Sequence, residues 1–209
     1  MSKRTQTPSS PEFAYRSLFA QVRLRLMHYH KLPSMPIDEG GELPIIPAEW
    51  LALQVRKICE AVAFAAVTGE EFSSGRSSPR RIMAPKNVLK ELKKHPSVVL
   101  PQAVDVQRDE FHRFMLLPRP DRNWTLESVL SAWHDASQIL HVKHPDDAQA
   151  VWLDPMREEM ERLLASLKAW LWTHTIVYQQ KAVLIQMGQY PHEFLTNLSS
   201  TEQPSPHTG

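Results

Sequence analysis

Three histidines that lie close together are the first residues whose chemistry stands out. His134 and His141 fall on one face of an expected helix, and His144 follows one turn later. Imidazole binds zinc, nickel and iron, so the three form a weak candidate metal site. Metal ligands must converge, however, and Pro145 turns the chain directly after His144. The sequence favours the alternative, a polar helix face, and predicts no metal and no cofactor.

A charged pair interrupts the most apolar segment of the chain. Arg56 and Glu60 are spaced four residues apart in a helix that is otherwise almost entirely hydrophobic. Buried charges are costly unless they are paired, so an internal ion pair that fixes helix packing is the first interpretation. The functional alternative is an acid–base site between helices, in which the pair faces His134 or His141. Arg56, Glu60 and His141 are therefore candidate catalytic residues.

Arginine and histidine recur in the first expected helix with four residues between them, as Arg23 with His28 and Arg25 with His30. This spacing resembles the ribonuclease motif of the HEPN family (higher eukaryotes and prokaryotes nucleotide-binding). The resemblance implies a helical bundle in which histidine and arginine act on the 2′-hydroxyl and the scissile phosphate of RNA. It makes Arg23 and His28 candidate catalytic residues. The chain departs from the family pattern, because leucines follow both arginines and the motif lies in the first helix.

Positive charge is concentrated in the middle of the chain. Residues 76–122 hold eleven lysines and arginines against five acids, whereas the whole chain has a formal charge of +1. Such a surplus attracts phosphate backbones, and Phe111, Phe114 and Trp124 are close enough in sequence to stack on single-stranded bases. The alternative is a solvated surface around a loop. The predicted nucleic-acid-binding residues are Arg76, Arg80, Arg81, Lys86, Lys90, Lys93 and Lys94.

The elements that must position these residues are mostly helical. Apolar residues at helical spacing predict five helices, over residues 12–31, 47–69, 86–94, 125–141 and 154–172. Pro47 and Pro155 mark two of the starts, and Thr125 is the expected N-cap of the fourth helix. The expected buried face of that fourth helix is Leu126, Val129, Leu130, Trp133 and Leu140. Alternating, β-branched residues in HTIVYQQ and AVLIQM predict a C-terminal hairpin, and residues 97–118 hold one or two short strands. The predicted fold class is mainly α (α+β), with about five helices in one domain and a small C-terminal β-hairpin.

Composition sets the domain organisation. Residues 1–11 and 199–209 are rich in Ser, Thr and Pro and predict disordered tails, which leaves a single domain over 12–198 with a basic linker near 73–85. Cys59 is the only cysteine, which excludes intramolecular disulfides and cysteine-based zinc fingers. The longest apolar run has seven residues and the N-terminus has no apolar stretch, so we expect a cytoplasmic protein without a membrane span.

Motifs of the common enzyme classes do not occur. The sequence holds six glycines and contains neither GxxxxGK[ST] nor GxGxxG, and HExxH and GxSxG do not occur either. A second resemblance covers more of the chain. The segments YRSLFAQVRLRL, LALQVRKICEAVAFAAV and ILHVKHP are similar to a group of uncharacterised bacterial helical proteins. The resemblance implies a bacterial or mobile-element setting and singles out Arg56, Glu60 and His141, without implying an activity.

These observations favour a non-enzymatic module that binds a protein partner or nucleic acid. A HEPN-like ribonuclease and a metal-dependent enzyme that uses the histidines from His134 to His144 are the alternatives. A homodimer is compatible with the sequence.

Overall fold

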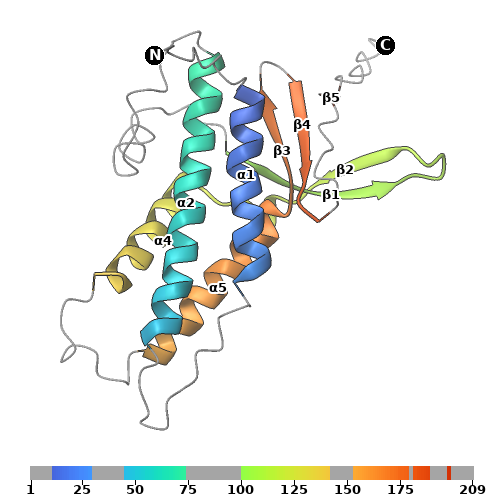
Figure 1. The fold of residues 1–209 in the computed structure, drawn as a ribbon. Helices are drawn as coiled ribbons and strands as arrows, with labels where there is room; N and C mark the ends of the chain where they lie inside the picture. Colours follow the sequence, from blue (N-terminus) through green and yellow to red (C-terminus); the bar gives the residue numbers. More distant parts are fainter. Residues whose placement is uncertain are drawn as a thin grey trace, which may run out of the picture.

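The computed structural model describes residues 11–29, 45–73, 100–141, 153–178, 181–188 and 197–198, which Figure 1 shows as a ribbon. The α-helices among them are α1 (Pro11–His28), α2 (Ile45–Ser73), α4 (Leu126–Ile139) and α5 (Leu153–Leu171). The strands are β1 (Gln102–Arg108), β2 (Phe114–Pro118), β3 (Thr173–Tyr178), β4 (Lys181–Gln186) and β5 (Asn197–Leu198), and the 3-10 helix η2 (Pro120–Arg122) follows β2. The fold is mainly α with some β, as the sequence predicts.

The longest helix, α2, lies at the centre of the helical layer. It packs against α1, α4 and α5, and its side chains Leu51, Val55, Ile58 and Val62 are almost completely buried. These positions follow helical spacing and form one continuous stripe, as the sequence predicts. Small residues such as Ala63 lie on other sides of the helix and are buried too. The helix is therefore enclosed by its neighbours along most of its length.

Helices α1 and α5 bury the apolar stripes that their spacing predicts. Tyr15, Phe19, Val22 and Leu26 of α1 join the same hydrophobic cluster as α2. From α5, the most deeply buried side chains are Met160, Leu164, Leu167, Trp170 and Leu171. Burial of these large side chains supplies much of the hydrophobic stabilisation of the fold.

Helix α4 begins as predicted but presents a different face. The Thr125 side chain accepts a hydrogen bond from the backbone N–H of Ser128 at 3.1 Å, which confirms the predicted N-cap. The buried residues are Val129, Ala132, Ala136, Ser137 and Ile139, whereas the predicted Leu126 and Leu130 are only half-buried. Small side chains such as alanine permit the close approach of α4 to α2, and this packing overrides the stripe of leucines.

The sheet has the order β2-β1-β3-β4-β5, and its neighbours run antiparallel. Strands β3 and β4 form the predicted C-terminal hairpin, with a register from Thr173↔Gln186 to Tyr178↔Lys181. Strand β1 pairs with β3 only at Gln102 and Ala103. The rest of β1, and β2 with it, therefore extends past the sheet, and Figure 1 shows this hairpin projecting from the body.

Several predicted features lie outside the described residues. These are the helix over 86–94, the basic linker near 73–85 and the tails 1–11 and 199–209. Two residues of these ranges are described, because Pro11 begins α1 and Ser73 ends α2. None of the helices in the described part of the chain combines the length and the apolar character that a membrane span requires.

Candidate functional site

The projecting hairpin, residues 102–118, is called the arm below. Ala103 and Val104 at its base are buried, but most of β1 and all of β2 lie beyond the hydrophobic core. Seven large hydrophobic side chains are exposed in the described residues, and four of them belong to the arm. These four are Phe111 at 67%, Phe114 at 67%, Met115 at 41% and Leu117 at 37% of their full exposure. An exposed apolar group of this kind typically marks an interaction site.

A network around Asp109 holds the tip of the arm in one conformation. The Asp109 Oδ1 atom accepts the backbone N–H of Phe111 at 2.9 Å and of Arg113 at 2.8 Å, and Oδ2 accepts the Arg113 Nε–H at 2.7 Å. Desolvation raises the pKa of Asp109, but these hydrogen bonds outweigh it and hold the pKa below its usual value. His112 adopts a left-handed conformation with φ of 60°, which the turn requires. The tip is thus organised before any partner binds.

Two arginines cover the exposed aromatic rings of the arm. The Arg108 guanidinium lies 4.9 Å from the ring centre of Phe114, and the Arg113 guanidinium lies 5.0 Å from that of Phe111. Both distances fall within the range of cation–π attraction. The arm therefore presents arginine and phenylalanine together on a preformed surface.

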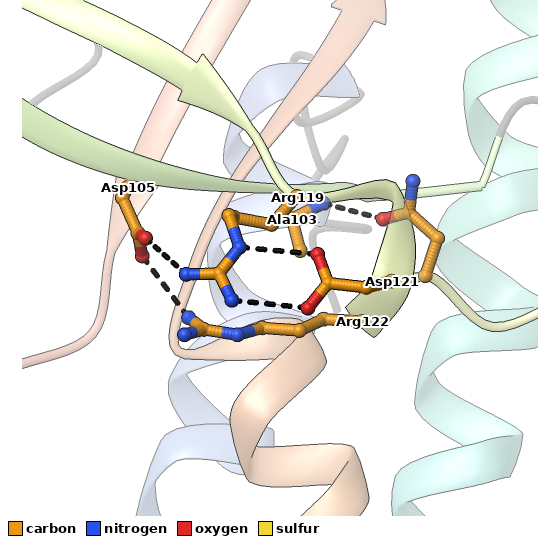
Figure 2. A network of polar contacts seen from close by, with 6 residues as sticks. Ala103, Asp105, Arg119, Asp121 and Arg122 are labelled. Carbon is orange, nitrogen blue, oxygen red and sulfur yellow. Dashed lines mark hydrogen bonds and ion pairs between the residues drawn. The ribbon is translucent and has the colours of Figure 1, made fainter.

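A second polar network, drawn in Figure 2, ties the base of the arm to η2. Asp105 accepts hydrogen bonds from Arg119 Nη1 and from Arg122 Nη1, the latter at 3.0 Å. Asp121 accepts Arg119 Nε–H at 3.1 Å and Nη2–H at 3.0 Å. The hydrogen bonds from Arg119 hold the pKa values of both aspartates below their usual range. Arg119 thus links β1 to η2 through both carboxylates.

The charges of the arm and its base are balanced. Residues 102–122 hold four arginines and four acidic residues, and three of these arginines form ion pairs with aspartates. The positive surplus predicted for residues 76–122 therefore comes entirely from residues 76–94, which lie outside the described residues. These include all seven residues predicted to bind nucleic acid. The arm itself offers phosphate no net attraction.

The surroundings of Trp124 weigh against the hypothesis that it stacks on bases. Its indole ring lies parallel to that of Trp170, with ring centres 5.7 Å apart and planes 5° apart, and its Nε1–H donates to Ser166 Oγ at 2.9 Å. Trp124 thus packs against the hydrophobic core beneath the arm. Phe111 and Phe114 are exposed as the stacking hypothesis requires.

Arg56 and Glu60 form the predicted ion pair, and their surroundings show its role. Glu60 is 5% exposed and accepts hydrogen bonds from Arg56 Nε at 3.0 Å, Lys57 Nζ at 2.8 Å and Trp133 Nε1 at 3.3 Å. The Arg56 guanidinium also lies 5.4 Å from the Trp133 ring centre. We call this set of four residues the Glu60 clamp. It joins α2 to α4, so its contacts are structural.

The predicted acid–base site between the clamp and the histidines does not form in the described residues, because Trp133 takes the place against Glu60. His134 is exposed, and its Nε2 lies 2.9 Å from Gln138 Nε2. His141 is exposed at the end of α4, and His144 lies outside the described residues. Within the part of the chain that the structure describes, no group of three or more His, Cys, Asp or Glu side chains is placed to hold a metal ion.

Arg23 and His28 leave α1 in different directions. Five residues of an α-helix turn through about 140° beyond one full turn, so the two side chains lie on different faces. Arg23 Nε donates to the Met187 carbonyl oxygen at 2.6 Å, whereas His28 is exposed. The contact of Arg23 ties α1 to the end of β4. This divergence weighs against one shared ribonuclease centre on α1.

A buried histidine that the sequence reasoning missed lies in β3. His174 Nδ1–H donates to the Leu171 carbonyl oxygen at 2.8 Å, so Nε2 accepts the Tyr15 hydroxyl at 3.2 Å. Burial lowers the pKa of His174 to about 4 and raises that of Tyr15. The alternation of His174 with the buried Ile176 could have revealed its inward direction. Both side chains are sealed in the core, so the pair anchors α1 to the sheet.

One pocket of about 400 Å³ opens beside the base of the arm. Its polar lining comes from Tyr29, Asp105, Arg122, Lys168, Trp172 and Thr173. The Asp105 carboxylate is engaged by two guanidinium groups, and the Lys168 ammonium lies 5.0 Å from the Trp172 ring centre. The lining holds no histidine, serine or cysteine.

Comparisons with protein-family models, with curated proteins and with solved structures find no match for this chain. The two resemblances seen in the sequence therefore stay predictions, and function is inferred from geometry.

Proposed function

We propose that the protein is a non-enzymatic protein-binding module and that the arm is its contact surface. The observation that carries this proposal is the preformed, projecting hairpin, on which Phe111, Phe114, Met115 and Leu117 are exposed together. These side chains add little to the core, so their exposure has a cost in solubility that a binding role explains. Phe and Met are enriched in protein interfaces, and arginine is a frequent hot-spot residue.

The balance of charge favours a protein partner for the arm over nucleic acid. Non-specific binding of nucleic acid depends on positive charge that displaces counterions, and the arm with its base, residues 102–122, has no net charge. Its arginines are occupied by Asp105, Asp109, Asp121 or the ring of Phe114. An apolar centre with a paired polar surround resembles the core and rim of a protein interface.

Site-specific photo-crosslinking in the cells that naturally make the protein tests the proposal. Benzoylphenylalanine in place of Phe111 should give a discrete adduct, whereas the same residue in place of the exposed Glu158 on α5 should give none. Adding Asp109→Ala to the variant that carries benzoylphenylalanine at position 111 should lower the adduct yield, because it removes the hydrogen bonds that order the tip. Equal yields from both positions, or none from Phe111, would refute the role of the arm.

A second candidate function is nucleic-acid binding by residues 76–94, which the seven lysines and arginines against one acid favour. Affinity for generic RNA should then fall steeply between about 50 and 200 mM salt. Reversal of Arg80, Arg81, Lys93 and Lys94 to Glu should abolish the binding, and Phe114→Ser should leave it unchanged. Filter binding measures both effects, and no retention of RNA at low salt would exclude this function.

A further inference from the structure

Strand β2 is one of the two edge strands of the sheet in the described residues, and β5 is the other. Two hydrogen bonds fix which of its backbone groups point outward: Arg119 N–H donates to the Ala103 carbonyl at 2.9 Å, and Asp109 N–H donates to the Arg113 carbonyl at 3.0 Å. Hydrogen-bonded and non-hydrogen-bonded residue pairs alternate along an antiparallel ladder. The backbone N–H and C=O groups of every second residue from 113 to 119 therefore point toward β1. The N–H and C=O groups of the residues between them, Phe114 and Leu116, therefore face away from β1.

This edge lacks the usual protection against pairing. Edge strands are commonly kept apart by charged side chains, prolines or bulges. Strand β2 reads FMLLP, has no charged residue, and carries its single proline at the last position, Pro118. Phe114 and Leu116 project on one side of the strand and Met115 and Leu117 on the other. Both sides and the edge itself are thus apolar and open to a partner strand.

The outward backbone N–H and C=O groups of β2 can pair with the same groups on a second copy of the strand. If two copies of the strand run antiparallel with a two-fold axis at residue 115, Phe114 of each copy lies opposite Leu116 of the other. Each such pair exchanges two hydrogen bonds, so all four outward N–H groups are satisfied. An axis at residue 116 would place Phe114 opposite Pro118, which has no N–H to donate. The strand therefore selects one register.

We infer that the partner of the arm is a second copy of this chain, joined by antiparallel pairing of β2 with β2 about an axis at Met115. This inference rests on the proposed function, for which it names the partner. Strand β2 holds no charged residue, and residues 102–122 together carry no net charge, so little charge repulsion opposes the contact of two identical surfaces. The pairing joins the two sheets into one and places Phe114 of each copy beside Leu116 of the other on the same face of the sheet.

A cysteine at the axis tests both the dimer and its register. At the axis, Met115 of one copy lies opposite Met115 of the other in a non-hydrogen-bonded pair, whose Cα atoms are about 4.5 Å apart. A disulfide can span this distance. Met115→Cys should therefore form a disulfide-linked dimer on mild oxidation. Leu117→Cys is the matched control: its side chain is similarly exposed and lies on the same side, but it opposes residue 113 of the other copy and should form no disulfide-linked dimer. Native Cys59 is buried and does not compete.

Sedimentation equilibrium of the unmodified chain completes the test. At concentrations up to about 200 µM we expect a mass approaching twice 24.0 kDa, since a contact of two strands is small and associates weakly. Leu116→Pro should give a monomer with an unchanged melting temperature, because the N–H that it removes points away from β1.

Three results would each overturn the inference. They are a monomeric unmodified chain at every concentration, equal oxidation of the two cysteine variants, and a dimer that persists in folded Leu116→Pro. A photo-crosslink from Phe111 to a different protein, together with a monomeric chain, would overturn the dimer while supporting the proposed function. No adduct together with a monomeric chain would overturn both.

Discussion

Replacing Glu60 by glutamine isolates the contribution of charge in the Glu60 clamp. Glutamine keeps the length of the side chain and an oxygen acceptor for the Trp133 indole, while it removes the carboxylate charge and replaces the oxygen that accepts from Lys57 by an NH₂ group. A fully buried ion pair that loses one partner costs about 3–5 kcal/mol. In the clamp Arg56 is 27% exposed and Lys57 42% exposed, so water takes up part of their charge. We therefore expect the free energy of unfolding to fall by about 2 kcal/mol, or the melting temperature by about 4–8 °C.

The stability lost in Glu60→Gln should depend on pH. Burial raises the pKa of Glu60, but the hydrogen bonds from Lys57, Arg56 and Trp133 outweigh it, and the pKa lies below its ordinary value of 4.5. A carboxyl whose folded-state pKa is lowered stabilises the fold above its unfolded pKa, and this contribution disappears as the pH falls through the folded pKa. The difference between the unmodified chain and Glu60→Gln should be full at pH 7 and should shrink below about pH 4.

Thermal melts followed by far-ultraviolet circular dichroism at pH 7 and in acid measure both effects. Glu158→Gln, at an exposed position of α5, is the control and should leave the melting temperature at pH 7 almost unchanged. Equal melting temperatures of the unmodified chain and Glu60→Gln at pH 7 would refute this reasoning, as would a difference that does not change with pH.

Three further predictions concern two buried side chains and one close packing contact. Burial lowers the pKa of His174 from 6.5 to about 4, so the melting temperature should decline as the pH falls from about 6.5 toward 4. Thermal melts of His174→Phe should not show this decline. Burial, followed by the nearby Glu60 charge, raises the pKa of the Cys59 thiol, so a thiol reagent should label Cys59 only after denaturation; prompt labelling of the folded chain would contradict its burial. Gly188→Ala would place a Cβ 2.9 Å from Trp172 Nε1 and should cost about 1–3 kcal/mol in denaturant titration; an unchanged midpoint would show that the indole moves aside freely.

Local signals in the sequence predict the helices well. The Thr125 cap and the prolines near the start of α2 and α5 place three helix starts within two residues of those observed. Caps and apolar periodicity act within a few residues of the chain, so a single sequence reveals them. The C-terminal hairpin is predicted for the same reason, because its two strands are adjacent in sequence.

Contacts between distant segments could not be predicted in this way. The pairing of Gln102 with Thr175 and the contact of Trp133 with Glu60 join residues that lie about seventy positions apart, and no local pattern encodes them. Trp124 shows the same limit, since its sequence neighbourhood fits stacking on bases whereas one face of its ring packs on Trp170. The residue type indicates what a side chain can do, and the long-range packing decides whether it is accessible.

The stacked indoles beneath the arm give the protein a built-in optical reporter. Trp124 follows η2, and Trp170 donates its Nε1–H to the Pro101 carbonyl immediately before β1, so the ring pair spans the two chain segments that carry the arm. Two indoles held nearly parallel at 5.7 Å couple their excited states and contribute to the near-ultraviolet circular dichroism. Any event that twists the root of the arm changes this coupling. Occupancy of the arm can thus be followed in unlabelled protein, by light that the chain itself absorbs.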